Sequence, residues 1–337
     1  MKKILLPWIL FSMFIQGNSQ QITGTVYDKL TQSMIRDATV FFNGSTVFTT
    51  TDKSGNFQLI PPEKGKLPII ATGRAYESLF LLEYKQNAHI HFYLDSKMFA
   101  FSNEILPKNE RSERQSRPLK VQIFREQFLG KSTYGSSCRI LNEGDLILTF
   151  EPHKNLLKAT CSNPLIIINK SLGYRIIYYL KKFEFNLNSE EVLCSGFLQF
   201  SDEPSLKAAE FEIAGRKREL AYFGSWMEFF RSLWSNSLDS AGYDLRSSSN
   251  KELTYDSLVI EKNGSKYWKY KGPVTIYHFS RNKSTTIQTS DTVYFDRLGY
   301  CDTDGIDWRR SGEMTLHRLG DQLPFDYKVN HTKNNMH

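Results

Sequence analysis

Turn residues divide the first part of the chain into short runs typical of β-strands, and this pattern constrains the fold more than any other feature. Each run is rich in β-branched and aromatic residues, and Gly, Pro, Asn or Asp follows several of them. The runs are Ile22–Tyr27, Thr39–Asn43, Val47–Thr51, Asn56–Ile60, Leu67–Ala71, Ser78–Glu83 and His89–Leu94. In the first run Ile22, Gly24 and Val26 share one face. Short strands at a spacing of about 8–12 residues predict a β-sandwich.

Several of these runs carry motifs that occur in a fixed order. Residues 22–28 (ITGTVYD), 38–42 (ATVFF), 51–57 (TDKSGNF) and 91–94 (HFYL) resemble the motifs of carboxypeptidase-regulatory-like domains. The resemblance implies a seven-stranded Greek-key sandwich of the prealbumin (transthyretin) type over residues 20–97. In the third motif we expect Asp52 to accept backbone hydrogen bonds, Gly55 to supply a positive φ, and Phe57 to re-enter the core.

One segment departs from the family pattern. The family places Gly and Tyr side by side near the end of the domain, whereas residues 73–76 of this chain read GRAY. We therefore expect a longer loop at this edge of the sandwich.

The resemblance implies an accessory module and not a peptidase. The zinc peptidases that give the family its name need a His-x-x-Glu pair, and none of the seven histidines has Glu three residues on. The chain also has no Gly-x-Ser-x-Gly elbow, no Gly-x-x-x-x-Gly-Lys loop and no Gly-x-Gly-x-x-Gly motif. We therefore predict no enzymatic activity, no catalytic residue and no cofactor apart from the calcium ion considered below.

The N-terminus has the three parts of a secretory signal peptide. Two lysines follow Met1, an apolar run covers residues 4–15, and Gly17 and Ser19 are the small residues of a cleavage site. We expect residues 1–19 to be removed and the mature chain to be exported, either to the periplasm or to the outer membrane and cell surface. No later run of about 18 apolar residues follows, so we predict no transmembrane helix.

The net charge does not favour nucleic acid as a partner. The chain has 43 basic and 36 acidic residues, and loss of Lys2 and Lys3 with the signal peptide leaves 41 basic residues. Such an excess over a long chain lacks the basic stripe that nucleic-acid binding requires. The tightest basic cluster, residues 216–218, is followed at once by Glu219 and is typical of a solvated helix start.

The rest of the chain predicts a second, mixed domain. Residues 107–118 are polar and bounded by prolines, so we interpret residues 98–117 as a linker. It leads to an α+β domain over residues 118–330, with a disordered tail at 331–337. Helical periodicity appears just after Pro118 and again over 218–238. The predicted strands are Leu146–Glu151, Leu156–Thr160, Leu165–Asn169, Tyr174–Phe185, Gly196–Phe200, Leu258–Lys262, Val274–Phe279, Thr286–Thr289 and Thr292–Phe295.

Blocks of this second half resemble sequences that recur downstream of such a sandwich in exported proteins of outer-membrane-bearing bacteria. The blocks are residues 128–130, 163–167 with 172–174, 222–225 with 229–231, and 318–324. The resemblance brings no assigned activity with it. It therefore supports the order of the domains and leaves the chemistry of the second domain open.

The best candidate for a metal site is an acidic turn near the C-terminus. Asp302, Asp304 and Asp307 lie within a turn that contains Gly305, and carboxylate oxygens are the ligands that Ca²⁺ prefers. The spacing departs from the EF-hand pattern, and the alternative is a simple Asp/Gly-rich turn between strands. We keep calcium as the predicted ligand of this turn, if it has one.

Two histidines and a group of aromatic residues form further candidates. His89 and His91 share one face of a strand and could reach one metal ion, but no third ligand can be named, so a surface pair is the favoured interpretation. The aromatic residues of 226–234 could lie at a membrane surface or line a ligand groove. They are Trp226, Phe229, Phe230 and Trp234, and burial in a core is the favoured alternative.

The cysteines leave the disulfide pattern open. Export allows disulfides, and four cysteines permit three pairings. The alternative is four isolated thiols. The cysteines are Cys138, Cys161, Cys194 and Cys301.

The first functional hypothesis is a non-enzymatic binding or structural module of the bacterial envelope. Its partner would be an envelope protein or a glycan, bound at the loops or edge strands of the sandwich. The first alternative is an envelope hydrolase with its site in residues 118–330. The second is an accessory protein that acts in trans on an outer-membrane uptake receptor, because this chain is too short to contain a plug and a large barrel.

Overall fold

The computed structural model describes residues 21–62, 65–85, 87–97, 110–279, 284–303 and 305–329, with the side chains of 110–115 left out. The predicted signal peptide (1–19), most of the predicted linker (98–117), Asp304 and the predicted tail (331–337) therefore lie outside the described residues. No helix among the described residues is long and apolar enough to cross a membrane.

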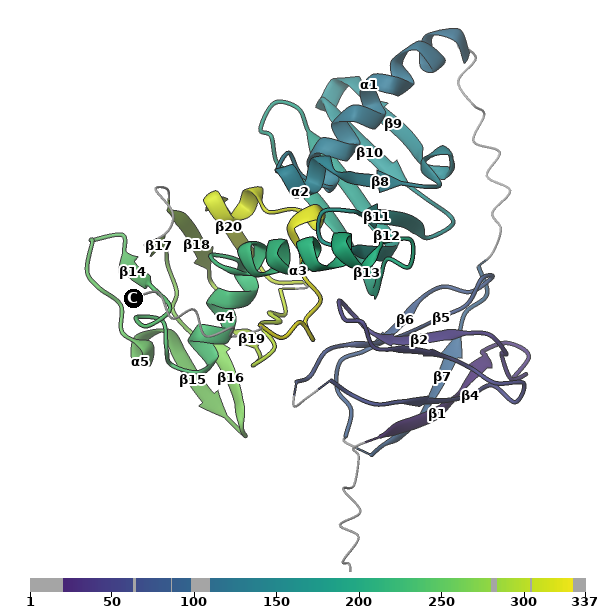
Figure 1. Ribbon diagram of the computed structural model, residues 1–337, viewed down its shortest axis with the longest axis horizontal. Coiled ribbons are helices and arrows are strands. Elements are labelled where there is room, and N and C mark those ends of the chain that lie inside the picture. The colour runs from purple at the N-terminus through teal and green to yellow at the C-terminus, as the bar shows by residue number, and fades with distance from the viewer. Residues whose placement is uncertain are drawn as a thin grey trace, which may run out of the picture.

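The N-terminal part is the predicted seven-stranded sandwich, at the lower right of Figure 1. Its strands are β1 (Ile22–Asp28), β2 (Thr39–Phe42), β3 (Phe48–Thr50), β4 (Asn56–Leu59), β5 (Ile69–Thr72), β6 (Leu79–Leu81) and β7 (His89–Leu94). One sheet has the order β4-β1-β7, with β1 and β7 parallel, and the other has the order β3-β2-β5-β6. All seven predicted strands are present, and alternating residues such as Ile22, Val26 and Phe92 fill the space between the sheets.

The turn before β4 is held by the side chain of Asp52. Its Oδ1 accepts the amide hydrogens of Ser54 at 2.8 Å and of Asn56 at 2.9 Å. Gly55 has φ +69°, and a Cβ there would lie 2.9 Å from the carbonyl oxygen of Val26. The turn thereby returns Phe57 to the core, where its side chain is buried.

A branched sheet follows the sandwich. Its elements are α1 (Glu110–Phe128), α2 (Thr133–Ser136), β8 (Cys138–Ile140), β9 (Ile147–Glu151), β10 (Leu156–Thr160), β11 (Leu165–Asn169), β12 (Tyr174–Asn186) and β13 (Val192–Asp202). The long β12 pairs with β13 along one edge. Along its other edge it pairs first with β11 and then with β10. The sheet therefore fans out from β12, and β13 forms one of its edges.

Helix α1 covers one face of this sheet (Figure 1). Phe124 and Phe128 pack against Phe183 of β12, with ring centroids 4.7 and 6.4 Å from that of Phe183. The helix begins at Glu110, eight residues before Pro118, within the segment interpreted as a linker. Residues such as Glu110, Arg111 and Glu113 favour a helix as readily as a polar coil, so composition alone does not place this boundary.

The elements that follow β13 include three α-helices and two small sheets. The elements are α3 (Ala208–Tyr222), α4 (Trp226–Trp234), β14 (Tyr243–Ser247), α5 (Tyr255–Leu258), β15 (Val259–Lys262), β16 (Ser265–Trp268), β17 (Val274–His278), β18 (Thr285–Thr289), β19 (Val293–Phe295) and β20 (Trp308–Gly312). The sheets have the orders β14-β17-β18-β20 and β15-β16-β19. They share a hydrophobic cluster with α4 that is separate from the cluster under α1, and we call it the third core, after those of the sandwich and the branched sheet. The described part of 118–330 thus contains two cores.

The β2–β3 turn of the sandwich docks on the edge of the branched sheet. The amide of Gly44 donates to the carbonyl of Leu198 at 2.7 Å, and the amide of Phe200 donates to that of Ser45 at 2.9 Å. The C-terminal segment holds the same turn from another side, because the amide of Phe325 donates to the carbonyl of Gly44 at 2.7 Å and the carboxylate of Asp326 binds Thr46. The sandwich is therefore fixed to both β13 and the C-terminal segment.

Candidate functional site

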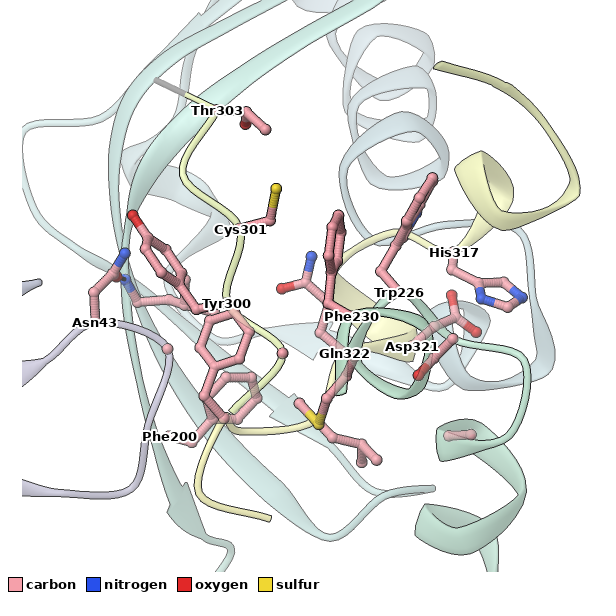
Figure 2. Close-up of a pocket in the computed structure, with 18 of the residues that line it drawn as sticks. Asn43, Phe200, Trp226, Phe230, Tyr300, Cys301, Thr303, His317, Asp321 and Gln322 are labelled. Carbon is pink, nitrogen blue, oxygen red and sulfur yellow. Dashed lines mark hydrogen bonds between the residues drawn. The ribbon is translucent and has the colours of Figure 1, made fainter. Parts of the chain in front are cut away.

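A cavity of about 290 Å³ lies where the sandwich turn, the branched sheet and the third core meet (Figure 2). Its volume is at the lower end of the range for ligand pockets. The lining residues come from five parts of the chain. They include Asn43 and Gly44, Leu198 and Phe200 of β13, Trp226, Met227 and Phe230 of α4, residues 299–301 and Thr303 with Trp308 and Arg310, and His317 with residues 321–323 and Phe325.

Aromatic rings form much of the wall. Figure 2 shows Trp226 and Phe230 next to each other, with Tyr300 and Cys301 across the cavity from them. The centroids of the Trp226 and Phe230 rings lie 6.2 Å apart in a stacked arrangement, and that of Trp308 lies 6.4 Å from that of Phe230. The cavity therefore offers flat apolar surfaces.

The start of α4 is fixed by polar contacts, which set the position of Trp226. Gly224 ends the preceding helix with φ +71°, and Ser225 caps α4 by accepting the amide hydrogen of Glu228. The buried carboxylate of Glu228 accepts the amide hydrogen of Gly224 at 2.6 Å and the hydroxyl hydrogen of Tyr243 at 3.0 Å. The single helical stretch expected over 218–238 is thus two helices with a capped break.

The cavity contains one cationic side chain that the protein does not neutralise. The guanidinium of Arg310 lies 5.4 Å from the centroid of the Trp226 ring. Among the described residues it has neither a hydrogen-bond partner nor an ion-pair partner. The side chain keeps access to solvent, yet surrounding protein atoms lower the pKa of Arg310 by desolvation. The guanidinium remains charged at neutral pH all the same.

Cys301 is the candidate nucleophile within the cavity, and its environment opposes that role. Burial raises the pKa of the Cys301 thiol well above its usual range, and the charge of Arg310 offsets this only in part. The thiol is therefore protonated at neutral pH, whereas attack on a substrate requires the thiolate. As it stands, this arrangement can bind a ligand but does not activate Cys301.

Two of the three predicted calcium ligands, Asp302 and Asp307, interact with different neighbouring side chains. Asp302 Oδ1 accepts the hydroxyl hydrogen of Tyr300 at 3.3 Å, and Asp307 Oδ1 pairs with Arg309 Nε at 3.0 Å. Asp304 lies outside the described residues. Within the described ranges, no group of three His, Cys, Asp or Glu residues could hold a metal ion. Calcium at this turn stays a prediction from the sequence.

The two strand histidines lie together on the exposed face of β7. Their ring centroids are 4.8 Å apart, and His89 Nδ1 lies 3.0 Å from the hydroxyl oxygen of Thr23. They share the outer face of the sheet with Tyr27 and Tyr93, whose rings stack at 5.3 Å. The arrangement is the expected surface pair.

The remaining candidates are largely core residues. Phe229 and Phe230 are buried in the third hydrophobic cluster, where Trp226 and Trp234 pack against them. Trp226 and Phe230 also line the cavity, so the core and the groove interpretations both apply to them. All four cysteines are free, so the structure has isolated thiols in place of the three possible pairings.

Sequence reasoning missed Arg310 and the cavity itself, but it selected two of the blocks that build it. The block 222–225 with 229–231 supplies Ser225 and Phe230, and the block 318–324 supplies Asp321, Gln322 and Leu323. A Trp-x-Arg pattern at 308–310, with both side chains on one face of a strand, was the remaining signal.

Next to the cavity, the buried carboxylate of Asp296 joins the sandwich to the third core. Its oxygens accept amide hydrogens from Leu298 at 2.8 Å, Tyr300 at 3.1 Å and, across the interface, Lys66 at 3.1 Å. Burial raises the pKa of Asp296 to about 6, although these three amides and the charge of Arg231 oppose the shift. Burial raises the pKa of the nearby Tyr84 phenol, and the charge of Asp296 raises that pKa further.

The raised pKa predicts that Asp296 makes the fold less stable as pH rises from about 4 to about 6. The folded chain holds the proton more tightly than the unfolded chain, so the stabilising effect is complete below the unfolded pKa and is lost as pH passes the folded pKa. A shift of about 2 units corresponds to about 3 kcal/mol. The free energy of unfolding of wild type minus that of Asp296→Asn should fall by this order across the window. A flat difference would contradict the prediction.

The comparisons with known proteins bear on the sandwich. Residues 22–103 match the family model of the CarboxypepD_reg-like domain. No curated protein matches the chain. A similar solved structure is that of a protein of unknown function from Bacteroides fragilis NCTC 9343, presumed to be membrane-associated. It is 11% identical over 87% of this chain and 93% of that chain, with a TM-score of 0.18, too low to assign either fold or function.

The family match covers less than half of the chain, so it describes the first domain and not the whole protein. Its range contains all seven strands β1–β7, and the motifs found in the sequence lie within it. The N-terminal sandwich is therefore a carboxypeptidase-regulatory-like domain.

Proposed function

We propose that the protein is an exported binding module of the bacterial envelope, which holds a small organic ligand in the cavity between its parts and catalyses no reaction on it. The observation that carries the proposal is the cavity itself, with aromatic walls and a guanidinium that has no hydrogen-bond or ion-pair partner among the described residues. Binding sites of small molecules have this composition, in which apolar walls surround a few polar groups.

Two further features support binding over catalysis. The thiol of Cys301 is protonated, and the carboxylate of Asp302 accepts a hydrogen bond from Tyr300.

The proposed compartment rests on the signal-peptide pattern of residues 1–19. The sandwich contributes Asn43 and Gly44 to the cavity wall, so the accessory domain takes part in the site.

A ligand-observed NMR screen of small organic molecules against the mature chain would test the proposal. We expect at least one compound to bind, and its affinity to fall about tenfold in Trp226→Ala, because a cavity wall is lost. Trp234→Ala is the matched control, since Trp234 packs on the same helix but does not line the cavity. Circular dichroism should show that both variants fold. A folded wild-type chain that binds none of the compounds, or hits that ignore Trp226, would overturn the proposal.

A further inference from the structure

Arg310 differs from Arg231 and Arg309 in what its side chain contacts. Arg231 donates to three backbone carbonyls, and the neighbouring Arg309 pairs with Asp307. The guanidinium of Arg310 forms neither kind of contact with the described residues and lies instead over the face of the Trp226 ring. The guanidinium keeps access to solvent, and the protein atoms around it desolvate it only in part, a cost that no ion pair of the described residues offsets. An anion in the cavity would supply the missing partner.

The nearest charges strengthen this reading. Arg318 lies close enough for its charge to lower the pKa of Arg310, so the field around Arg310 contains a second cation. The carboxylates near the cavity accept hydrogen bonds from groups other than Arg310. Asp321, which lines the cavity, accepts the amide hydrogen of Arg318 at 3.3 Å at the start of a 3-10 turn. Asp302, which lies beside the cavity wall, accepts the hydroxyl hydrogen of Tyr300 at 3.3 Å.

The walls beside Arg310 favour a flat ligand. Trp308 and Arg310 lie two residues apart on the edge strand β20, so their side chains project from the same face. The indole N–H of Trp226 is already used, since it donates to the carbonyl of Met314 at 3.0 Å. The indole N–H of Trp308, another residue of the cavity wall, has no hydrogen-bond partner in the part of the chain that the structure describes.

We infer that the ligand of this cavity is a small aromatic carboxylic acid, with its carboxylate on the guanidinium of Arg310 and its ring against Trp226, Phe230 and Trp308. This inference rests on the proposed binding function and names the class of ligand. Guanidinium and carboxylate match in charge and in planar geometry, and such pairs are among the stronger hydrogen bonds in proteins. The volume of about 290 Å³ suits a molecule with one or two rings.

The test compares an acid with its neutral amide. Indole-3-acetate and indole-3-acetamide have nearly the same shape, and isothermal titration calorimetry reports the binding of either. We expect the mature wild-type chain to bind the acid at least about tenfold more tightly than the amide. Arg310→Gln should bind the two equally, whereas Arg310→Lys should keep part of the preference. Arg309→Gln is the control, because Arg309 is exposed and pairs with Asp307 outside the cavity wall.

The outcomes separate this inference from the proposed function. If the amide binds as tightly as the acid, or if Arg310→Gln keeps the preference for the acid, the inference is wrong and the binding function stands. If neither probe binds, the compounds found in the NMR screen decide the matter, since hits without a preference for anions also overturn the inference. If that screen finds no ligand, the proposed function fails and the inference fails with it.

Discussion

Gly320→Ala is expected to destabilise the chain by about 3 kcal/mol, because the added methyl group has no space. A Cβ at this position would lie 2.3 Å from Cα of Gly135 and 2.7 Å from the carbonyl oxygen of Leu129. These are backbone atoms, so a rotamer change cannot relieve the contact. The strain would also disturb the hydrogen bond from the amide of Gly320 to Leu129 and the one from the buried side chain of Asn169 to Gly320, both 2.8 Å long.

Urea unfolding followed by tryptophan fluorescence measures the effect as a lower transition midpoint at an unchanged slope. Gly215→Ala provides the matched control. Gly215 lies within α3, and a Cβ there would meet no atom within 4 Å. Alanine should therefore stabilise the chain by about 0.5–1 kcal/mol through its higher helix propensity and its restriction of the unfolded state. Equal midpoints for the two variants would show that the close approach at Gly320 is not a constraint on stability.

Arg231→Met should cost about 2–4 kcal/mol, because three carbonyl groups lose a charged donor. The guanidinium of Arg231 donates to the carbonyls of Leu298 at 3.1 Å and of Phe325 and Tyr327 at 3.0 Å each. Methionine keeps the apolar stem and removes only the hydrogen-bonding end. The C-terminal segment should loosen, and with it the hydrogen bond from the amide of Phe325 to Gly44 of the sandwich.

Hydrogen exchange distinguishes this local loosening from general destabilisation. The Phe325 amide should exchange faster in Arg231→Met, while the amides in the centre of β12 should change only as far as global stability requires. Arg216→Met serves as the control. Its side chain is exposed and pairs with Glu212 one helical turn away, so its loss should cost less than about 0.5 kcal/mol. Unchanged exchange at Phe325 would contradict the role assigned to Arg231.

The sequence predicted the sandwich well because its information is local. Alternation of side chains such as Ile22 and Val26 defines a strand within a few residues, and the turn at Asp52 and Gly55 is set by neighbours in the sequence. Helix boundaries were harder to predict from the sequence. The break between α3 and α4 depends on Gly224 and on the capping residue Ser225, which lie within one apolar stretch.

The cavity could not be assembled from local patterns. Its walls combine Asn43, Trp226 and Arg310, which lie far apart in the chain and meet only through the docking of separate cores. The acidic turn is a candidate metal site in the sequence because its three carboxylates lie close together in the chain, although nearness in the chain does not place their oxygens around one point. The aromatic run at 226–234 was ambiguous for a physical reason, since Phe230 belongs to the core and to the cavity wall at once.

The docking of the β2–β3 turn has a consequence for the order in which the chain folds. The sandwich is synthesised first and has its own core, but Thr46 binds Asp326, which follows it by 280 residues. Contacts between residues so far apart form late, because a long loop must be closed before they contribute. We therefore expect the sandwich to fold before its contacts with β13 and the C-terminal segment form. The cavity is completed only when the C-terminal segment closes over the turn, so a ligand there would recognise the finished chain and none of its folding intermediates.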